Sequence, residues 1–166
     1  MGLDISLQNV ETNEVIFVKG DARNLPFKDK SIDIVISTEV IEHFVEGERF
    51  IEECFRVLKN EGIFILTTPN RLRFTAWPRN VKFRVKGSRI VPGPTSEHLR
   101  EYTPQELSNI LKATGFKILK LDFIGFNPYL PYMSEKLYIF LDRLTDRSKL
   151  LKMLTKWDMI LIAKKE

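Results

Sequence analysis

The sequence predicts a single α/β domain built on a mostly parallel sheet. Two runs, Ile32–Ser37 and Ile63–Thr68, are apolar at nearly every position and rich in β-branched residues. Such runs are typical of strands that are buried on both faces of a parallel sheet. A stretch with helical spacing separates them, and strands and helices continue to alternate after them, which predicts an α/β fold. A length of 166 residues fits one domain.

The composition is that of an ordinary globular protein and does not indicate a specific function. The net charge is +4, from 26 basic and 22 acidic residues, so charge alone does not favour a nucleic-acid-binding protein. The single cysteine, Cys54, forms no disulfide within the chain, which favours a reducing cytoplasm. No apolar run approaches the roughly 18 residues that a membrane-spanning helix needs. The first residues lack the pattern of a signal peptide.

The first half of the chain predicts a strand–helix–strand unit. A strand over Val15–Val18 ends at Lys19-Gly20-Asp21, and a proline-containing loop leads to the strand over Ile32–Ser37. Apolar residues at helical spacing predict a helix over Gly47–Lys59, with Cys54 as inert core and Gly62 at positive φ just past its end. The strand over Ile63–Thr68 follows and stops at Pro69-Asn70. Such a crossover is almost always right-handed.

The second half predicts one capped helix, two further strands and an amphipathic region. Thr103-Pro104-Gln105-Glu106 is a capping box, and Gly115 ends the helix that it starts. Residues 116–124 alternate apolar and polar, which predicts a strand. Residues 134–153 are expected to be helical and residues 157–163 to form the last strand.

Residues 71–96 differ from the rest of the chain because they are basic throughout. They contain no acidic residue, and their cations are Arg71, Arg73, Arg79, Lys82, Arg84, Lys86 and Arg89. We interpret residues 71–100 as an insertion or lid over one edge of the domain. The alternative is an RNA-binding segment, because Phe74, Trp77 and Phe83 add stacking surfaces to the charge.

Polar residues follow several predicted strands at their carboxyl ends, where open α/β sheets bind ligands. Asp21 follows one strand, Ser37 ends the next, and Asn70 follows the third. Asp4 has the same position if Leu3 ends an earlier strand. Two carboxylates at neighbouring strand ends are suited to accept hydrogen bonds from paired hydroxyls or an exocyclic amine, and a nucleoside offers both. Taken on its own, Asp21 is better explained as a turn former, because Gly-Asp is common after a strand.

An ordered set of motifs resembles the class I S-adenosylmethionine-dependent methyltransferases of the ubiquinone-biosynthesis type. The set consists of Gly2–Ser6, Gly20–Phe27, Ser31–Ser37, Glu39–His43, Phe55–Gly62, Leu66–Asn70, His98–Leu107 and Gly115-Phe116. Each motif alone is weak, and their order along nearly the whole chain makes the resemblance specific. It implies a Rossmann-like sheet with helices on both faces and an antiparallel C-terminal strand. It also implies methyl transfer from S-adenosylmethionine to an acceptor, which we expect to be a small molecule.

The resemblance implies a role for each matched residue. Asp4 would bind the ribose hydroxyls of S-adenosylmethionine. Asp21 would bind the adenine amine, Ala22 would lie beside the adenine ring, and Ser37 would line the methionine end. The residues that would face the acceptor are His43, Asn70, His98 and Tyr102. His43 and His98 are candidates for a general base. Glu39, Glu42 and His43 at helical spacing raise a metal site as an alternative. Because Glu39 stands where one zinc pattern has histidine and the chain has only two histidines, we expect no metal.

The family's first strand and glycine-rich loop have no counterpart in this sequence, so we expect an N-terminally truncated version of the sheet. Its second and fourth strands would then carry unpaired backbone groups, which are costly when buried. A longer natural chain, a partner chain, a second copy or a rearrangement of the first residues would close the sheet. A non-catalytic partner subunit is therefore the alternative to an enzyme.

Overall fold

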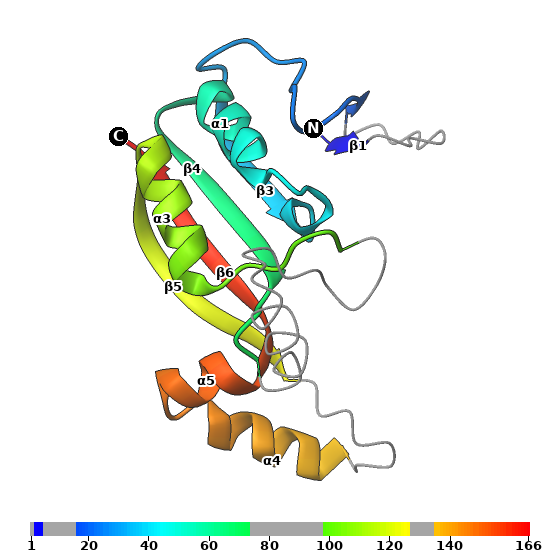
Figure 1. Cartoon of the computed structure of the whole chain (residues 1–166), viewed down its shortest axis with the longest axis vertical. Coiled ribbons are helices and arrows are strands. Elements are labelled where there is room, and N and C mark those ends of the chain that lie inside the picture. The colour runs from blue at the N-terminus through cyan, green and yellow to red at the C-terminus, as the bar shows by residue number, and fades with distance from the viewer. Residues whose placement is uncertain (1, 5–15, 74–97, 127–134) are drawn as a thin grey trace, which may run out of the picture.

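The computed structural model describes residues 2–4, 16–73, 98–126 and 135–166, and the predicted α/β class is confirmed (Figure 1). Its elements are β1 (Gly2–Asp4), β2 (Phe17–Lys19), β3 (Ile32–Thr38), the 3-10 helix η1 (Ile41–His43), α1 (Gly47–Val57), β4 (Leu58–Pro69), α3 (Pro104–Thr114), β5 (Phe116–Phe126), α4 (Glu135–Thr145), α5 (Lys149–Thr155) and β6 (Lys156–Lys165).

The main sheet has four strands in the order β3-β4-β6-β5. β3 and β4 pair in parallel, whereas β6 pairs antiparallel with both β4 and β5. Strands β3, β4 and β5 therefore run in the same direction, and only the C-terminal strand of this sheet runs in the opposite one. This confirms the predicted mostly parallel sheet with an antiparallel C-terminal strand. It also brings the carboxyl ends of β3 and β4 to one edge.

The first helix ends two residues earlier than predicted. α1 stops at Val57 and β4 begins at once, so Lys59 lies in a strand and not in the last turn of a helix. The residue with positive φ is Glu61, at 67°, and not Gly62. Gly62 is needed for a different reason: a Cβ there would lie 2.8 Å from the carbonyl oxygen of Lys59. Close backbone approach, which the sequence does not reveal, decides this position.

The second helix follows its local sequence closely. Thr103 accepts a hydrogen bond from the backbone N–H of Glu106, and the Glu106 side chain accepts one from the backbone N–H of Thr103. Gly115 ends the helix in the left-handed region, with φ 107°. Residues 134–153, predicted as one helical region, contain two helices, because the chain turns between α4 and α5.

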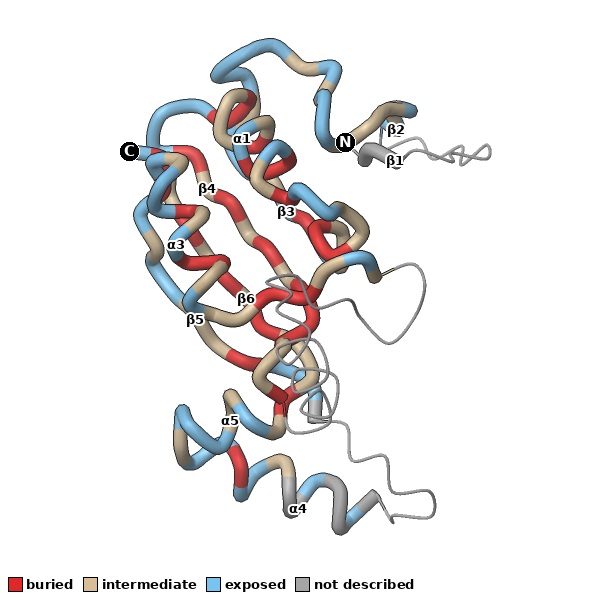
Figure 2. The backbone as a smooth tube through the Cα atoms, viewed as in Figure 1, coloured by how far each residue is buried: buried red, intermediate tan, exposed pale blue. Residues whose placement is uncertain are grey.

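Helices α1 and α3 pack on the same face of the sheet, and the main core lies beneath them (Figures 1 and 2). This face carries Phe64, Leu66, Met159, Leu161 and other buried residues. On the opposite face the cross-strand register places Ile34 beside Ile63 and Ile36 beside Ile65. Ile34 and Ile36 are 56% and 66% exposed. Within the described ranges, the expected helical layers are therefore present on one face.

β3 forms the free edge of the main sheet, since its described strand partner is β4 alone. β1 and β2 pair with each other in parallel as a separate two-stranded sheet. This break in the strand order matches the expected position of the missing family strand. The expected lid, residues 71–100, lies mostly in residues 74–97, which are outside the described residues. None of the described helices is long and apolar enough to cross a membrane.

Candidate functional site

The carboxyl ends of β3 and β4 meet three other segments and form one polar edge. The backbone N–H of Glu39, at the end of β3, donates to the carbonyl of Thr67 at 3.2 Å. Residues 98–102 return to the same place: the N–H of Arg100 donates to the carbonyl of Glu42 at 3.1 Å, and Tyr102 forms a parallel β-bridge with Asn70. The start of β6 completes the edge, because Asp158 pairs in register with Pro69.

Buried polar atoms without a hydrogen-bond partner gather at this edge. Among the described residues they are Oγ of Ser37, Oε1 of Glu42, Nε of Arg73, Nδ1 of His98, the hydroxyl of Tyr102 and Oδ1 of Asp158. Folded proteins pair the great majority of such atoms, and each exception calls for an explanation. A group of exceptions at the carboxyl end of a sheet is the pattern expected of a ligand site.

A hollow of about 730 Å³ runs along the free edge of β3. Its lining residues are Ala22, Leu25, Phe27, all of Ser31–Thr38, Val40, Phe50, Cys54 and Val57. The volume lies in the range of small-molecule sites, roughly 300–1,000 Å³. Most of the wall is apolar, and the buried hydroxyl of Ser37 lies at the carboxyl end. The structure thus brings the predicted cofactor residues Ala22 and Ser37 to the same hollow.

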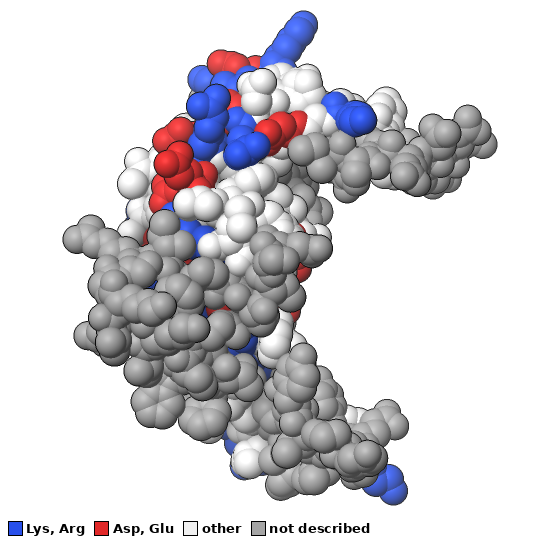
Figure 3. All heavy atoms as spheres, turned by 45° about the vertical axis from the view of Figure 1, so that its right-hand side comes forward, with Lys and Arg blue, Asp and Glu red and all other residues white. Residues whose placement is uncertain are grey.

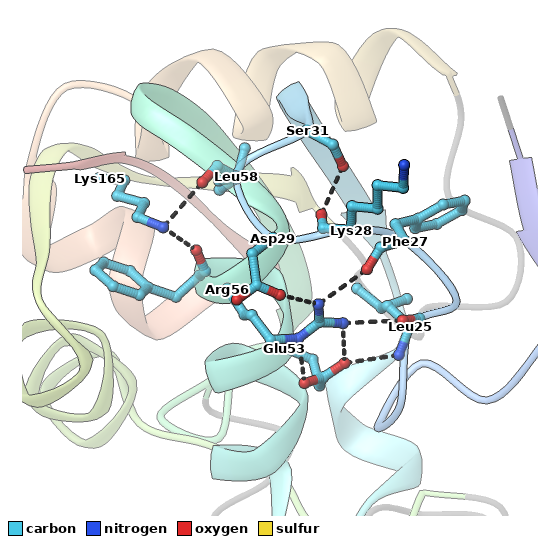
Figure 4. A network of polar contacts seen from close by, with 10 residues as sticks. Leu25, Phe27, Lys28, Asp29, Ser31, Glu53, Arg56, Leu58 and Lys165 are labelled. Carbon is cyan, nitrogen blue, oxygen red and sulfur yellow. Dashed lines mark hydrogen bonds and ion pairs between the residues drawn. The ribbon is translucent and has the colours of Figure 1, made fainter.

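A dense polar network fixes the outer wall of the hollow (Figure 4). The guanidinium of Arg56 on α1 donates to the carbonyls of Leu25 and Phe27, each at 2.9 Å, and to the carboxylates of Glu53 and Asp29. Glu53 in turn accepts from the N–H of Leu25 at 2.8 Å. The hydrogen bonds from Arg56 lower the pKa of Glu53. The loop at 25–29 is therefore tied to α1 by charge-assisted hydrogen bonds.

Asp21 occupies a turn that its own neighbours stabilise. Its carboxylate accepts from the N–H of Arg23 at 2.8 Å and from the Arg23 guanidinium at 2.7 Å. These bonds lower the pKa of Asp21. Asp21 is not among the residues that line the hollow, although the adjacent Ala22 is. Asp4 is the last residue of β1 and pairs in register with Lys19, two residues before Asp21. The carboxyl ends of β1 and β2 therefore lie together, as predicted.

The predicted acceptor residues His43 and His98 lie side by side. Their ring centroids are 5.2 Å apart and the rings meet edge to face. Glu42 lies with them and is fully buried; its Oε2 accepts from Oγ1 of Thr68 at 2.9 Å. Burial, together with the nearby charge of Glu39, raises the pKa of Glu42 to about 8. The structure thus brings together two residues that the sequence predicted and one that it had considered only as part of a metal site.

Asn70 and Tyr102 are both fully buried. The amide of Asn70 donates to the carbonyl of Met153 at 2.6 Å, and its oxygen accepts from the N–H of Leu72 at 3.0 Å. These bonds hold the end of β4 against α5. Burial raises the pKa of Tyr102 to about 12, and the guanidinium of Arg100 lies 4.4 Å from its ring centroid. Both residues lie at the polar edge, as the sequence predicted, and their side chains are buried within the protein.

Sequence reasoning missed Asp158 and the ion pair of Arg73 with Glu101. Arg73 and Glu101 are almost completely buried, with 2.7 Å between Nη2 and Oε1. Burial and the charge of Glu39 raise the pKa of Asp158 to about 7. One signal was available, because Asp158 is an acidic residue within the otherwise apolar run Trp157–Ala163. The partners of Arg73 and Glu101 lie 28 positions apart, and no local pattern joins them.

Two of the cations assigned to the basic segment have acidic partners. Arg71 pairs with Glu106 at 2.8 Å, and Arg73 pairs with Glu101. Figure 3 shows basic and acidic side chains intermingled over the described surface near α1. The remaining cations of the predicted RNA-binding segment, from Arg79 to Arg89, lie outside the described residues.

Comparisons with known proteins give one consistent answer. The family model described as a methyltransferase domain matches residues 1–66. A probable S-adenosylmethionine-dependent methyltransferase of Mycolicibacterium smegmatis is 34% identical over 103 residues, which are 60% of this chain and 34% of that protein. The ubiquinone biosynthesis O-methyltransferase of Bartonella quintana is 26% identical over 137 residues, 77% of this chain and 55% of that protein. The chain thus spans about a third to about half of these relatives.

Solved structures share the fold. A S-adenosylmethionine-dependent methyltransferase from Archaeoglobus fulgidus superposes with a TM-score of 0.65 at 21% identity, covering 99% of this chain and 75% of that one. One from Thermotoga maritima, described as a possible histamine N-methyltransferase, gives 0.64 at 21% identity, covering 92% and 65%. The family match over residues 1–66 and the shared Rossmann-like fold make this chain similar to the class I S-adenosylmethionine-dependent methyltransferases.

Proposed function

We propose that the protein transfers a methyl group from S-adenosylmethionine to a small-molecule acceptor at the carboxyl edge of β3 and β4. The observation that carries this proposal is the group of buried, unpartnered polar atoms at that edge. Such atoms are costly unless a ligand completes them. The relatives are named as methyltransferases, which supports the same chemistry.

The cofactor would lie where the hollow meets the carboxyl end of β3. The buried hydroxyl of Ser37 suits the methionine end of the cofactor, and Ala22 gives a small apolar surface for the adenine ring. Asp21 and Asp4 remain the proposed partners of the adenine amine and the ribose. The sulfonium of the cofactor supplies the reactive methyl group, and the protein's residues position the acceptor and exclude water. His98 and Tyr102, with Asn70 holding the end of β4, would form the acceptor side.

The apolar remainder of the hollow has the shape and position of a strand site. It follows β3 from Ile32 to Thr38, whose outer backbone groups have no strand partner among the described residues. A free strand edge is a ready template for pairing. We therefore propose that a further strand completes the sheet here, supplied by a partner chain, a second copy or more of the same polypeptide. Without it, the non-catalytic subunit stays the competing interpretation.

Titration with S-adenosylhomocysteine in a calorimeter tests the cofactor site. Ser37→Ala removes a hydroxyl that has no described partner, so the fold should keep its stability. Loss of one hydrogen bond to the cofactor should weaken binding about five- to tenfold. Glu52→Ala, an exposed residue of α1, is the matched control and should bind like the wild type.

Two variants separate the two interpretations of Asp21. Asp21→Ala removes the carboxylate and every bond that it accepts from Arg23, whereas Arg23→Ala removes the guanidinium bonds and keeps the carboxylate with its backbone bond. If the Asp21 carboxylate binds the adenine amine, only Asp21→Ala should lose affinity. Equal losses in both would mean that the ion pair with Arg23, and not a contact of Asp21 with the cofactor, supports binding. A folded wild-type chain that does not bind S-adenosylhomocysteine would contradict a working cofactor site in this chain alone.

The RNA-binding alternative receives less support. Arg71 and Arg73, two cations of that segment, form ion pairs with Glu106 and Glu101. RNA binding would weaken steeply as salt increases and would survive Asp21→Ala, whereas cofactor binding would show the opposite pattern. The expected cytoplasmic location remains a prediction.

A further inference from the structure

Helices α4 and α5 form a hairpin that lies beyond the carboxyl end of β4 (Figure 1). α5 leads directly into β6 at Lys156. The side-chain amide of Asn70, at the end of β4, donates to the carbonyl of Met153 at 2.6 Å and to that of Lys156 at 3.4 Å. The hairpin is thus joined to the polar edge at its β6 end. Ligands of such sheets bind on this side, so the hairpin is placed to cover one.

Apolar packing holds the hairpin only weakly. None of the residues of α5 is buried, although most of them are apolar (Figure 2). Lys152 and Met153 face the sheet, because Lys152 reaches β5 and Met153 packs against the core. Helical spacing places Leu150, Leu151 and Leu154 on the opposite side of α5. These leucines are 60%, 42% and 37% exposed, so they add little hydrophobic stabilisation to the closed position.

Ion pairs join the hairpin to the sheet instead. Lys156 is almost completely buried and pairs with Asp142 on α4 and, at 3.0 Å, with Asp146 in the turn between the helices. Lys152 on α5 pairs with Asp122 on β5 at 3.3 Å and with Asp146 at 3.9 Å. Burial opposes the charge of Lys156, but its hydrogen bonds to Asp142 and Asp146 raise its pKa, so it stays protonated at neutral pH.

Such a connection can be exchanged for water more easily than a packed core. The side chains of Asp142 and Asp146 are 35% and 48% exposed, so solvent and salt reach the acidic half of each pair. Salt weakens exposed charge pairs and does not weaken apolar burial. Segments that move are drawn from the parts of a fold with few buried apolar contacts. The α4–α5 hairpin therefore has both the place and the weak attachment of a moving part.

We propose that the α4–α5 hairpin is a gate over the polar edge, which the ion pairs of Lys156 and Lys152 hold closed. Its role as a gate rests on the proposed function. The closed hairpin would exclude water from the methyl transfer, and the open one would admit the acceptor and release the product. The bonds of Asn70 at the β6 end would serve as the fixed end of this movement.

Amide hydrogen exchange followed by mass spectrometry tests the ion pairs without cofactor or acceptor. The wild-type chain is compared at about 0.05 M and about 1 M KCl, where the screening length falls from more than 10 Å to about 3 Å. Exchange in α5 should become about fivefold faster at high salt. Exchange in α3 should not change, because Leu107 and Leu111 anchor that helix in the core.

Two variants and a matched control locate the effect. Lys156→Met should accelerate exchange in α5 about fivefold at low salt and remove most of the response to salt. Lys149→Met changes an exposed cation of the same helix that has no acidic partner among the described residues, and it should behave like the wild type. Asp146→Asn removes a partly exposed partner of both lysines. It should give a smaller acceleration, about twofold, and it keeps the test valid if circular dichroism shows that Lys156→Met does not fold.

A cysteine introduced by Asp158→Cys reports whether the movement uncovers the polar edge. Residues two apart on a strand face the same side, so position 158 lies on the side of β6 from which Lys156 reaches the hairpin. The rate of its modification by N-ethylmaleimide, read by peptide mass so that Cys54 is counted separately, should rise about fivefold when Lys156→Met is added. Loss of a nearby cation alone would slow a thiol, so an increase reports opening. In the Asp146→Asn background the increase should be about twofold.

The outcomes separate the two parts of the proposal. Exchange in α5 that does not respond to salt, or that is equal in Lys149→Met and the folded variants of the ion pairs, would overturn the role of the ion pairs. Faster exchange without faster modification at position 158 would overturn the gate alone. Failure of the chain to bind S-adenosylhomocysteine would count against the proposed function, and both of these measurements would still give their answers.

Discussion

The polar groups near the amino end of β4 have hydrogen-bond partners, whereas several near its carboxyl end lack them. Near its amino end, Arg56 places its guanidinium among two carbonyls and two carboxylates, and Glu53 accepts from the N–H of Leu25 (Figure 4). Near its carboxyl end, Glu42, Asp158 and four other residues keep buried atoms without partners among the described residues. Both ends belong to one sheet and share one core.

This difference indicates which end of β4 contributes to the stability of the fold and which end is suited to binding a ligand. A completed network holds a loop in place and needs nothing more, so it stabilises the fold. An incomplete network stores an unfavourable free energy that a ligand can remove on binding, which is typical of functional sites. The amino end should therefore respond to mutation through the free energy of unfolding. The carboxyl end should respond through ligand affinity, and some of its mutations should stabilise the free protein.

The largest effect on stability is expected for Arg56→Met. This change keeps most of the apolar stem but removes the guanidinium donor from the carbonyls of Leu25 and Phe27, and it leaves the carboxylate of Glu53 with the N–H of Leu25 alone. Because part of this network is exposed to solvent, we expect a loss of about 2–3 kcal/mol in the free energy of unfolding. Urea denaturation measures it.

Lys59→Met is the matched control for Arg56→Met. Lys59 also pairs with a carboxylate, that of Asp33, but both side chains are largely exposed. Exposed pairs contribute little, so the change should stay within about 0.5 kcal/mol. Equal losses in the two variants would mean that the Arg56 network has no special role.

Asp158→Asn should have the opposite sign. The pKa of Asp158 is raised to about 7 in the folded protein from an ordinary value of 3.8, mainly by burial. The folded state therefore binds the proton more tightly, and the stability that this gives is present below pH 4 and is lost as pH rises through 7. Asn cannot ionise, so the variant should be more stable than the wild type by about 1–2 kcal/mol at pH 8.

Thermal melting between pH 4 and pH 8, with EDTA present, checks this prediction. The two proteins should have similar stability at pH 4 and diverge as pH rises. Glu42, whose pKa is raised to about 8, remains in both proteins, so the variant keeps part of the pH dependence. A variant that is less stable than the wild type at pH 8 would contradict the interpretation of Asp158 as a buried, destabilising charge.

The smallest effect is expected for Thr103→Ala. Thr103 lies at the carboxyl edge, but its capping box with Glu106 is complete. Loss of such a cap costs about 1 kcal/mol. Affinity for S-adenosylhomocysteine should not change, because the hydrogen bonds of Thr103 are all made within the capping box. Thr114→Ala, at the other end of α3, serves as the comparison. A marked loss of affinity in Thr103→Ala would contradict the distinction between polar groups that have their partners and those that lack them.

Local patterns predicted most of the fold. The apolar runs at 32–37 and 63–68, the capping box at Thr103 and the left-handed Gly115 each depend on neighbours a few positions away, and each was confirmed. The helix end near Gly62 was predicted wrongly, because contact with the carbonyl of Lys59 and not the local sequence requires glycine there. The predicted sites of Ala22 and Ser37 lie in one hollow because the carboxyl-end rule depends on topology.

The sequence by itself predicted the fold class and the resemblance to a methyltransferase family, because hydrophobic periodicity and ordered motifs are local properties. Only the tertiary structure decided which polar groups meet. His98 joins Glu42 and His43 across 55 positions, and Asp158 joins the end of β4 from the last strand. The sequence shows that these residues are present, but whether a side chain is buried and whether it has a hydrogen-bond partner depend on how the chain packs. On those two properties we base the proposal that a ligand binds at this edge of the sheet.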